Sequence, residues 1–229
     1  MSKAQSVGII MDGNRRYAEK NGVTTLEGHK AGYSKLKELL SWSEEAGVHY
    51  VTVYAFSTEN WKRDPLEVSY LMDLFRFALE NEIQTFIDRK IRVQVIGSRS
   101  KLSSDLQKMI INAEQKTSQF SGMTLAIAFS YGGRAEIIDV CTRIAEKYKK
   151  GEIEMIDEKV ISNHLWTAQI PDPDLIIRTS GEVRLSNFLP WQSVYSELAF
   201  TKTLWPDLTK GEFIDILNDF EVRNRRNGK

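Results

Sequence analysis

An aspartate and two arginines follow the first apolar run of the chain, in the segment Met11-Asp12-Gly13-Asn14-Arg15-Arg16-Tyr17. Guanidinium groups pair well with phosphate oxygens, and Gly13 would let the backbone approach an anion closely. A carboxylate repels phosphate unless a divalent cation lies between them, so Asp12 indicates Mg²⁺. Two plainer interpretations stay open: Asp12 could cap the following helix, and the arginines could form a solvated basic patch.

Polar segments also follow two other apolar runs. Ser57–Arg63 surrounds a tryptophan with polar side chains, which suits a site but also suits a plain loop anchored by an aromatic ring. Arg178–Phe188 carries Arg178, Arg184 and Ser186 around a glycine, and guanidinium forks match phosphate oxygens in pairs. Since an arginine that ends a buried strand needs an anionic partner, this segment is a candidate second diphosphate cradle.

Two single residues are weaker candidates. Glu197 begins the last apolar run and is a second candidate carboxylate for a metal, or an ordinary charge on an edge strand. His29 stands near the start of a helical segment, and a lone histidine gains a role only in company with other site residues. The chain lacks a glycine-rich nucleotide-phosphate loop, a dinucleotide fingerprint and a nucleophile elbow.

Short apolar runs alternate with longer helical patterns along the whole chain. The expected strands are Val7–Met11, Tyr50–Phe56, Ile91–Ile96, Met123–Phe129, Leu175–Arg178 and Leu198–Phe200. The expected helices are Glu27–Ala46, Pro65–Arg89, Ser103–Gln119, Ala135–Lys150, Asp157–Trp166 and Lys210 to about Arg225. This alternation predicts an α/β fold with a mostly parallel sheet covered on both faces. Such sheets place ligands at the carboxyl ends of their strands, where the polar segments lie.

The helix expected over Pro65–Arg89 has apolar residues on more than one face. A surface helix normally shows a single apolar stripe. The segment is therefore either buried between the sheet and its neighbours, or at a dimer interface, or one of its faces lines an apolar cavity. Periodicity does not separate these interpretations.

Composition limits the classes of function. The 229 residues suit one sizeable domain. Lys plus Arg equals Asp plus Glu, at 31 each, so a globally basic nucleic-acid binder is not indicated. Cys141 is the only cysteine, which excludes an internal disulfide and fits a reducing cytosol. With no signal peptide and no apolar run near ~18 residues, we expect a cytoplasmic protein that could touch membranes at their surface.

The segments with candidate chemistry resemble, in order, those of the cis-prenyltransferase family, which includes undecaprenyl diphosphate synthase. The matching motifs are MDGNRR, EGHKAG, YAFSTENW, IRTSGEVRLSNF, PWQSVYSELAF and RNRRNG. The resemblance covers essentially the whole chain. It implies a single catalytic domain over residues 1–229, with about six mostly parallel strands surrounded by helices. It also implies a homodimer in which each protomer holds an elongated apolar tunnel.

The implied reaction condenses isopentenyl diphosphate onto an allylic diphosphate, such as farnesyl or geranylgeranyl diphosphate, with Mg²⁺ as cofactor. Diphosphate is released, and the product is a cis-polyprenyl diphosphate for lipid-carrier synthesis. Each added isoprene unit gains roughly 4 kcal/mol on burial, at ~0.8 kcal/mol per CH₂, which favours a chain that lengthens until the tunnel is full. The proton acceptor is either a diphosphate oxygen or a polar group near Asn60.

The resemblance also implies a role for individual residues. Asp12 and Asn60 would be catalytic, and Asp12 and Glu197 would form the metal environment, Glu197 across the dimer interface. The allylic diphosphate would be bound by Gly13, Asn14, Arg15, Arg16 and Tyr17, with His29 nearby. The wall between the reacting ends would comprise Ser57, Glu59, Asn60, Trp61 and Arg63. Isopentenyl diphosphate would be bound by Arg178, Arg184, Ser186 and the partner's terminal segment around Gly228. The tunnel would be lined by Leu71, Leu74 and Phe75, with Met123 near its far end.

Two departures from the bacterial pattern leave the preferred primer open. The first loop reads N-R-R-Y where many bacterial relatives read N-G-R-W, and Thr25 stands where many relatives place an arginine.

One alternative function is a non-catalytic subunit of a two-chain enzyme, although such partners tend to lose the Asp12 and Arg residues of the first loop. The other is a synthase that makes short or irregularly joined products.

Overall fold

Six parallel strands form the centre of the molecule, in the order β3-β4-β2-β1-β5-β6. The computed structural model describes residues 3–223 of the chain. The strands are β1 (Ser6–Ile10), β2 (Tyr50–Ser57), β3 (Arg92–Ile96), β4 (Thr124–Tyr131), β5 (Leu175–Arg178) and β6 (Glu197–Phe200). The predicted α/β class with a mostly parallel sheet is confirmed, and every pairing within the described sheet is parallel.

The central strands are buried because both faces of the sheet are covered. Non-helical segments that include Ile170, Phe188 and Leu189 pack on one face. Four helices pack on the other face, namely α2 (Thr25–Ala46), α3 (Pro65–Asn81), α5 (Ser104–Thr117) and α8 (Lys210–Val222). Every residue of β1, β4 and β5 is buried, which explains why these strands read as continuous apolar runs rather than alternating ones. β6 is one of the two edge strands and is only partly covered. Parallel pairing brings the carboxyl ends of the strands to one edge, so the segments after β1, β2 and β5 become neighbours.

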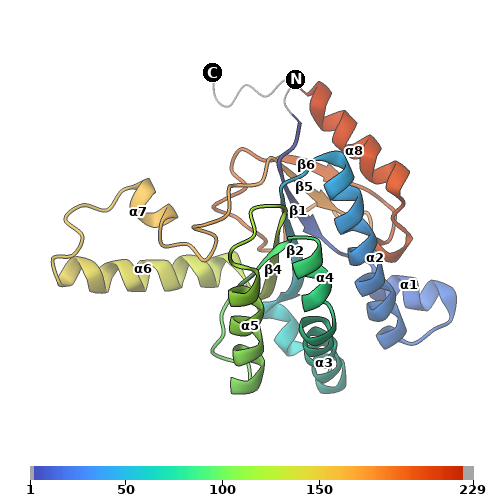
Figure 1. The fold of residues 1–229 in the computed structure, drawn as a ribbon, viewed down its shortest axis with the longest axis horizontal. Coiled ribbons are helices and arrows are strands. Elements are labelled where there is room, and N and C mark those ends of the chain that lie inside the picture. The colour runs from blue at the N-terminus through green and yellow to red at the C-terminus, as the bar shows by residue number, and fades with distance from the viewer. Residues whose placement is uncertain (1–2, 224–229) are drawn as a thin grey trace.

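Helices connect β1 to β2, β2 to β3, β3 to β4 and β4 to β5, whereas β5 is joined to β6 by residues 179–196, which contain no helix (Figure 1). The helices are α1 (Asn14–Asn21), α2 (Thr25–Ala46), α3 (Pro65–Asn81), α4 (Ile83–Asp88), α5 (Ser104–Thr117), α6 (Gly133–Lys149), α7 (Glu158–Ser162) and α8 (Lys210–Val222), with short 3₁₀ helices η1 (Thr58–Lys62) and η2 (Trp205–Asp207). In Figure 1, α2, α3 and α4 lie together beside the sheet, and α6 projects to the side with α7 above it. Within residues 3–223, no helix is long and apolar enough to cross a membrane.

Helix boundaries differ from the expected ones where local hydrogen bonds decide them. α2 begins at Thr25 because Thr24 and Glu27 form a reciprocal capping box ahead of it. The segment expected as one helix over Pro65–Arg89 is broken at Glu82, which ends α3 and precedes α4. The helix expected over Asp157–Trp166 is regular only to Ser162.

The apolar helix α3 packs on the sheet with part of its surface. Phe75 and Leu79 are buried, and the Phe75 ring stacks on Phe129 of β4 with centroids 3.9 Å apart. On another face, Leu66 and Phe77 are exposed. Burial against the sheet therefore accounts for some of the apolar surface of this helix, and the lining of a cavity accounts for more, as the site shows.

Candidate active site

The loop after β1 presents its aspartate to a pocket instead of capping a helix. Gly13 is the N-cap of α1, with φ of 117°, and none of the side chains in residues 3–223 makes a capping hydrogen bond to this helix. A Cβ at Gly13 would lie 3.1 Å from the backbone of Leu204, so glycine fits this turn. The interpretation of Asp12 as a helix cap is therefore wrong. Its backbone oxygen accepts hydrogen bonds from Thr179 Oγ1 at 2.6 Å and Trp205 N at 3.0 Å, which hold the loop in place.

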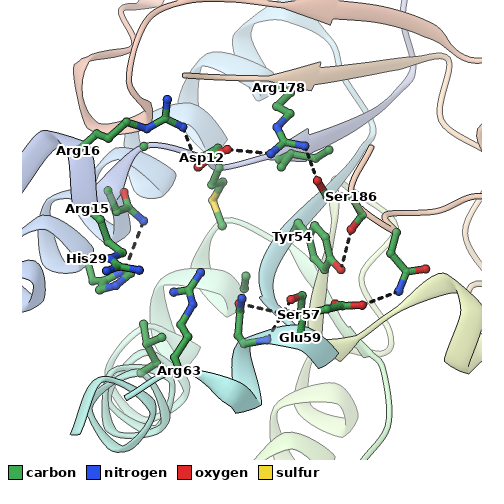
Figure 2. A pocket seen from close by; sticks show the side chains of 18 of the residues that line it. Asp12, Arg15, Arg16, His29, Tyr54, Ser57, Glu59, Arg63, Arg178 and Ser186 are labelled. Carbon is green, nitrogen blue, oxygen red and sulfur yellow. Dashed lines mark hydrogen bonds and ion pairs between the residues drawn. The ribbon is translucent and has the colours of Figure 1, made fainter. Parts of the chain in front are cut away.

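Arg178 joins the first loop to the segment after β5. Its Nη2 donates to Oδ2 of Asp12 at 2.8 Å, and its Nη1 donates to Oγ of Ser186 at 2.7 Å (Figure 2). Arg16 lies on the other side of Asp12, at 3.5 Å. Arg178 is only 4% exposed, and the expectation that it needs an anionic partner is met by Asp12. Among the described residues, Nε of Arg178 is buried without a hydrogen-bond partner.

The segment after β2 forms the opposite wall. Ser57 Oγ accepts from the Asn60 amide at 3.3 Å, and Asn60 Oδ1 accepts from the Ser57 amide at 3.0 Å, which shapes η1. Glu59 accepts from Nδ2 of Asn187 at 3.0 Å. Partial burial would raise the pKa of Glu59, but hydrogen bonds from its own backbone amide and from Asn187 outweigh burial and lower the pKa. Glu59 therefore carries a negative charge at neutral pH.

His29 belongs to a buried group at the start of α2. Its Nε2 lies 3.1 Å from Oε1 of Glu67, which also accepts from Nη1 of Arg63 at 2.8 Å. Its Nδ1 lies 3.5 Å from Nδ2 of Asn14. Burial lowers the pKa of His29 despite the nearby carboxylate, so the ring is neutral near pH 7. A neutral ring with its proton on Nε2 donates to Glu67 and accepts from Asn14.

These segments enclose a polar pocket of about 790 Å³. The sequence-predicted residues that line it are Asp12, Gly13, Asn14, Arg15, Arg16, His29, Ser57, Glu59, Asn60, Arg63, Leu71, Arg178 and Ser186. Residues that the sequence reasoning missed also line it, among them Tyr54 and Asn187. The Tyr54 ring stacks on Phe188 at 4.8 Å, and its hydroxyl donates to the backbone oxygen of Ser186 at 3.4 Å. The sequence signal that could have found Tyr54 and Asn187 is their place in motifs of the family resemblance, since Tyr54 begins YAFSTENW and Asn187 lies in IRTSGEVRLSNF.

Some predicted residues do not line this pocket. Trp61 packs edge-on against Phe56 and donates from Nε1 to Ser130 Oγ at 3.0 Å, so it anchors η1. Arg184 is largely exposed and pairs with Glu182 at 2.5 Å. Tyr17 is half-buried on α1 and lies outside the lining. Gly228 falls outside the described residues.

Glu197 lies far from Asp12 within the described residues. It pairs with Leu175 at the beginning of β5, whereas Asp12 follows the carboxyl end of β1. Arg223 Nη1 donates to Oε2 of Glu197 at 3.0 Å. Within residues 3–223, no cluster of three His, Cys, Asp or Glu side chains could hold a metal ion. Asp12 still fits Mg²⁺, because this ion is commonly held by one or two carboxylates together with substrate phosphates.

An apolar cavity of about 130 Å³ continues from the polar pocket. The two share Met11, Asn14, His29, Ala55 and Leu71 as lining residues. Further in, Leu74 and Phe75 of α3 line the cavity, together with Leu125, Ile127 and Phe129 of β4. Met123, expected near the far end, is buried in the core instead and does not line the cavity; Leu125 takes that place.

Comparisons with known proteins agree with this arrangement. A family model described as "Putative undecaprenyl diphosphate synthase" matches residues 10–228. An isoprenyl transferase of Thermotoga maritima is 46% identical over 98% of this chain and 96% of the relative. A tritrans,polycis-undecaprenyl-diphosphate synthase (geranylgeranyl-diphosphate specific) of Methanocaldococcus jannaschii is 47% identical over 97% of this chain and 82% of the relative.

Solved structures are similar over nearly their whole length. Lavandulyl diphosphate synthase from Lavandula x intermedia, in complex with dimethylallyl diphosphate, superposes with a TM-score of 0.95 at 35% identity, covering 99% of both chains. A probable undecaprenyl diphosphate synthase from Campylobacter jejuni superposes with a TM-score of 0.84 at 32% identity, covering 100% of both chains.

Proposed function

The chain belongs to the undecaprenyl diphosphate synthase family of cis-prenyltransferases, and we propose that residues 1–229 form one catalytic domain whose polar pocket holds both substrates. The enzyme condenses isopentenyl diphosphate onto an allylic diphosphate and releases diphosphate. The observation that carries the site assignment is the continuity of an arginine-bearing polar pocket with an apolar cavity. A polar pocket that continues into an apolar cavity suits a substrate with a diphosphate head and a hydrocarbon tail.

The two arginine segments bind different diphosphates in this proposal. The N-terminus of α1, which none of the described side chains caps, faces the allylic diphosphate together with Asn14, Arg15 and Arg16. Arg178 and Ser186 bind isopentenyl diphosphate, and the unpartnered Nε of Arg178 offers that ligand a further donor. Arg184 reaches the same ligand only if it leaves Glu182, because the two are now paired at the surface.

Asp12 is the proposed ligand of Mg²⁺ in the pocket. Bound there, Mg²⁺ would neutralise negative charge that develops on the departing diphosphate. Arg16 lies 3.5 Å from Asp12 and stabilises the same charge, which is the largest electrostatic demand of the reaction. Glu197 stays a candidate for the metal environment only through a homodimer, and Gly228 only through the partner's terminal segment.

The wall formed by Ser57, Asn60 and Arg63 aligns the reacting ends. The allylic carbon–oxygen bond breaks, a carbon–carbon bond forms to the double bond of isopentenyl diphosphate, and that unit then loses a proton. We assign the proton to a diphosphate oxygen. The amide of Asn60 is not basic, and its Oδ1 already accepts the Ser57 amide proton.

The alternative functions differ in their products. A non-catalytic subunit is disfavoured because Asp12, Arg15 and Arg16 are present and line the pocket. A short-chain or irregular synthase is favoured by one observation, the TM-score of 0.95 with lavandulyl diphosphate synthase. We nevertheless propose a polyprenyl product for lipid-carrier synthesis, made by a cytoplasmic homodimer that contacts membranes through its product.

One assay separates these functions. The purified full chain is incubated with radiolabelled isopentenyl diphosphate, Mg²⁺ and dimethylallyl, geranyl, farnesyl or geranylgeranyl diphosphate. Polyprenyl chains made from farnesyl or geranylgeranyl diphosphate and lost on chelation with EDTA would support the proposal. Incorporation without any primer extension beyond one unit would favour the short-chain function, and no incorporation with any primer would favour the non-catalytic one.

A further inference from the structure

A hydrogen-bonded group of Tyr33, Lys37 and Glu82, here called the polar seam, lines part of the cavity. It is separate from Asn14 and His29, the polar residues that the cavity shares with the polar pocket. Tyr33 and Lys37 stand one turn apart on α2, and Glu82 lies between α3 and α4. Glu82 Oε1 accepts from the Tyr33 hydroxyl at 2.7 Å and from Lys37 Nζ at 2.8 Å. Although Glu82 is the N-cap residue of α4, its side chain makes no capping hydrogen bond and instead links α2 to the junction of α3 and α4.

The polar seam lies deep along the cavity, away from the polar pocket. α2 and α3–α4 run side by side in the same direction, since His29 contacts Glu67 and, further on, Lys37 contacts Glu82. Leu71, which both cavities share, precedes Glu82 by about three turns of helix. A prenyl chain that grows from the polar pocket past Leu71 therefore reaches the polar seam late in its elongation.

The charged groups of the polar seam oppose the entry of a hydrocarbon chain between them. Burial would raise the pKa of Glu82, but the hydrogen bonds from Lys37 and Tyr33 outweigh burial and lower the pKa, so the carboxylate is ionised. The Glu82 side chain is 10% exposed and that of Lys37 is 51% exposed. The seam thus stands between the cavity and solvent. Parting the pair against an apolar chain would leave a buried charge without its partner, which is strongly unfavourable.

The small volume of the cavity makes the polar seam important for the binding of a long chain. At about 130 Å³ it is below the ~300–1,000 Å³ of typical ligand pockets, so a long chain must widen it. The β4 side of the cavity is part of the buried sheet, so it cannot move far to widen the cavity. Movement of α2 away from α3–α4 is the remaining route, and the polar seam holds these helices together.

We propose that the polar seam determines the length of the longest product, by holding α2 against the junction of α3 and α4 until the growing chain can no longer widen the cavity. This inference rests on the proposed function, in which the apolar cavity receives the growing chain. Tyr33, Lys37 and Glu82 are then specificity-determining residues that contact neither diphosphate.

The test replaces the ionic pair with apolar side chains of similar size, in the double variant Lys37→Met/Glu82→Leu. Products made from farnesyl diphosphate and excess isopentenyl diphosphate are resolved by chain length, and thermal unfolding is measured beside them. The matched control is Glu44→Leu/Arg89→Met, which removes another ion pair between α2 and the end of α4, at 2.6 Å, that does not line the cavity. We expect the longest product of the seam variant to gain one or more isoprene units, and that of the control to stay unchanged.

The inference is overturned if the seam variant melts within a few degrees of wild type and makes chains of wild-type length. Equal lengthening by the control would also overturn it, because loosened helix packing would then be the cause. If the double variant does not fold, Glu82→Gln decides, since it removes the buried charge without changing volume, and an unchanged length contradicts the inference. Failure of Leu71→Trp to alter product length would instead remove the proposed role of the cavity, and the seam's role with it.

Discussion

Arg178 donates a hydrogen bond of 2.8 Å to Asp12, so the guanidinium proposed for one diphosphate holds the carboxylate proposed for the metal. The two residues follow neighbouring parallel strands, β5 and β1. A diphosphate that drew Arg178 away from Asp12 would free Oδ2 of this carboxylate to bind a cation. The two substrate segments are therefore coupled, and effects of substitution at Arg178 should spread to both substrates.

Asp12→Asn should reduce turnover by about 10²- to 10³-fold or more, because the variant keeps the side chain's volume but loses the charge that would hold Mg²⁺. Initial rates in saturating Mg²⁺ measure this loss, and thermal unfolding shows whether the fold persists. Asp12→Ala should be equally inactive. Retention of more than a few per cent of wild-type activity by either variant would argue against the metal role.

Arg178→Ala should weaken the apparent binding of both substrates, whereas Arg184→Ala should affect isopentenyl diphosphate alone. Arg178 contacts Asp12 as well as Ser186, whereas the Arg184 side chain pairs with Glu182 at the surface. Loss of a charged hydrogen-bond partner costs roughly 1.5–3 kcal/mol, or about ten- to a hundred-fold. Apparent KM values for each substrate test the difference. An Arg178→Ala variant with an unchanged KM for the primer would contradict the coupling.

The stability of the protein should fall as pH decreases from about 7 to 5.5, in part because of His29. Burial lowers the pKa of His29 below 6.5 in the folded protein. The unfolded chain therefore binds more protons in this range, and stability is lost as the pH drops, by at most about 1.4 kcal/mol per pH unit. The pKa of Glu67 is also lowered, but a carboxyl loses its contribution below about pH 4.5.

The His29 contribution is measured by urea unfolding at several pH values. His29→Gln should make the free energy of unfolding less dependent on pH between 7 and 5.5. Gln keeps hydrogen-bonding groups near Glu67 and Asn14 but does not titrate. Identical slopes for the variant and wild type would show that His29 does not titrate abnormally.

Leu71→Trp should shorten the product more than Leu74→Trp does, since Leu71 lies where the polar pocket meets the apolar cavity and Leu74 lies further in. Product lengths and melting temperatures are measured together. Overpacking alone would cost ~1–3 kcal/mol of stability and reduce total activity without changing chain length. Destabilised variants that still make wild-type chains would identify this helix face as core.

Much of the fold and of the candidate site was predicted from short segments of sequence. Continuous apolar runs such as those of β1 and β4 predicted buried parallel strands, and this topology brought the polar segments after them to one edge. The motifs around Asp12, Asn60 and Arg178 predicted a phosphate-binding pocket. These features depend on residue type and on neighbours a few positions away, which is why the linear order of residues determines them.

Only the tertiary structure decided which of these groups meet. Arg178 contacts Asp12 across 166 positions of sequence, and Glu82 contacts Lys37 across 45. The break of the predicted helix at Glu82 and the burial of Met123 outside the cavity likewise depend on how α3 and β4 pack. Strand register and helix packing determine such contacts. The periodicity of apolar residues shows which face of a helix is buried, but it does not show which element packs against that face. For this reason the motifs implied the reaction through the family that they resemble, but the polar seam was visible only in the folded chain.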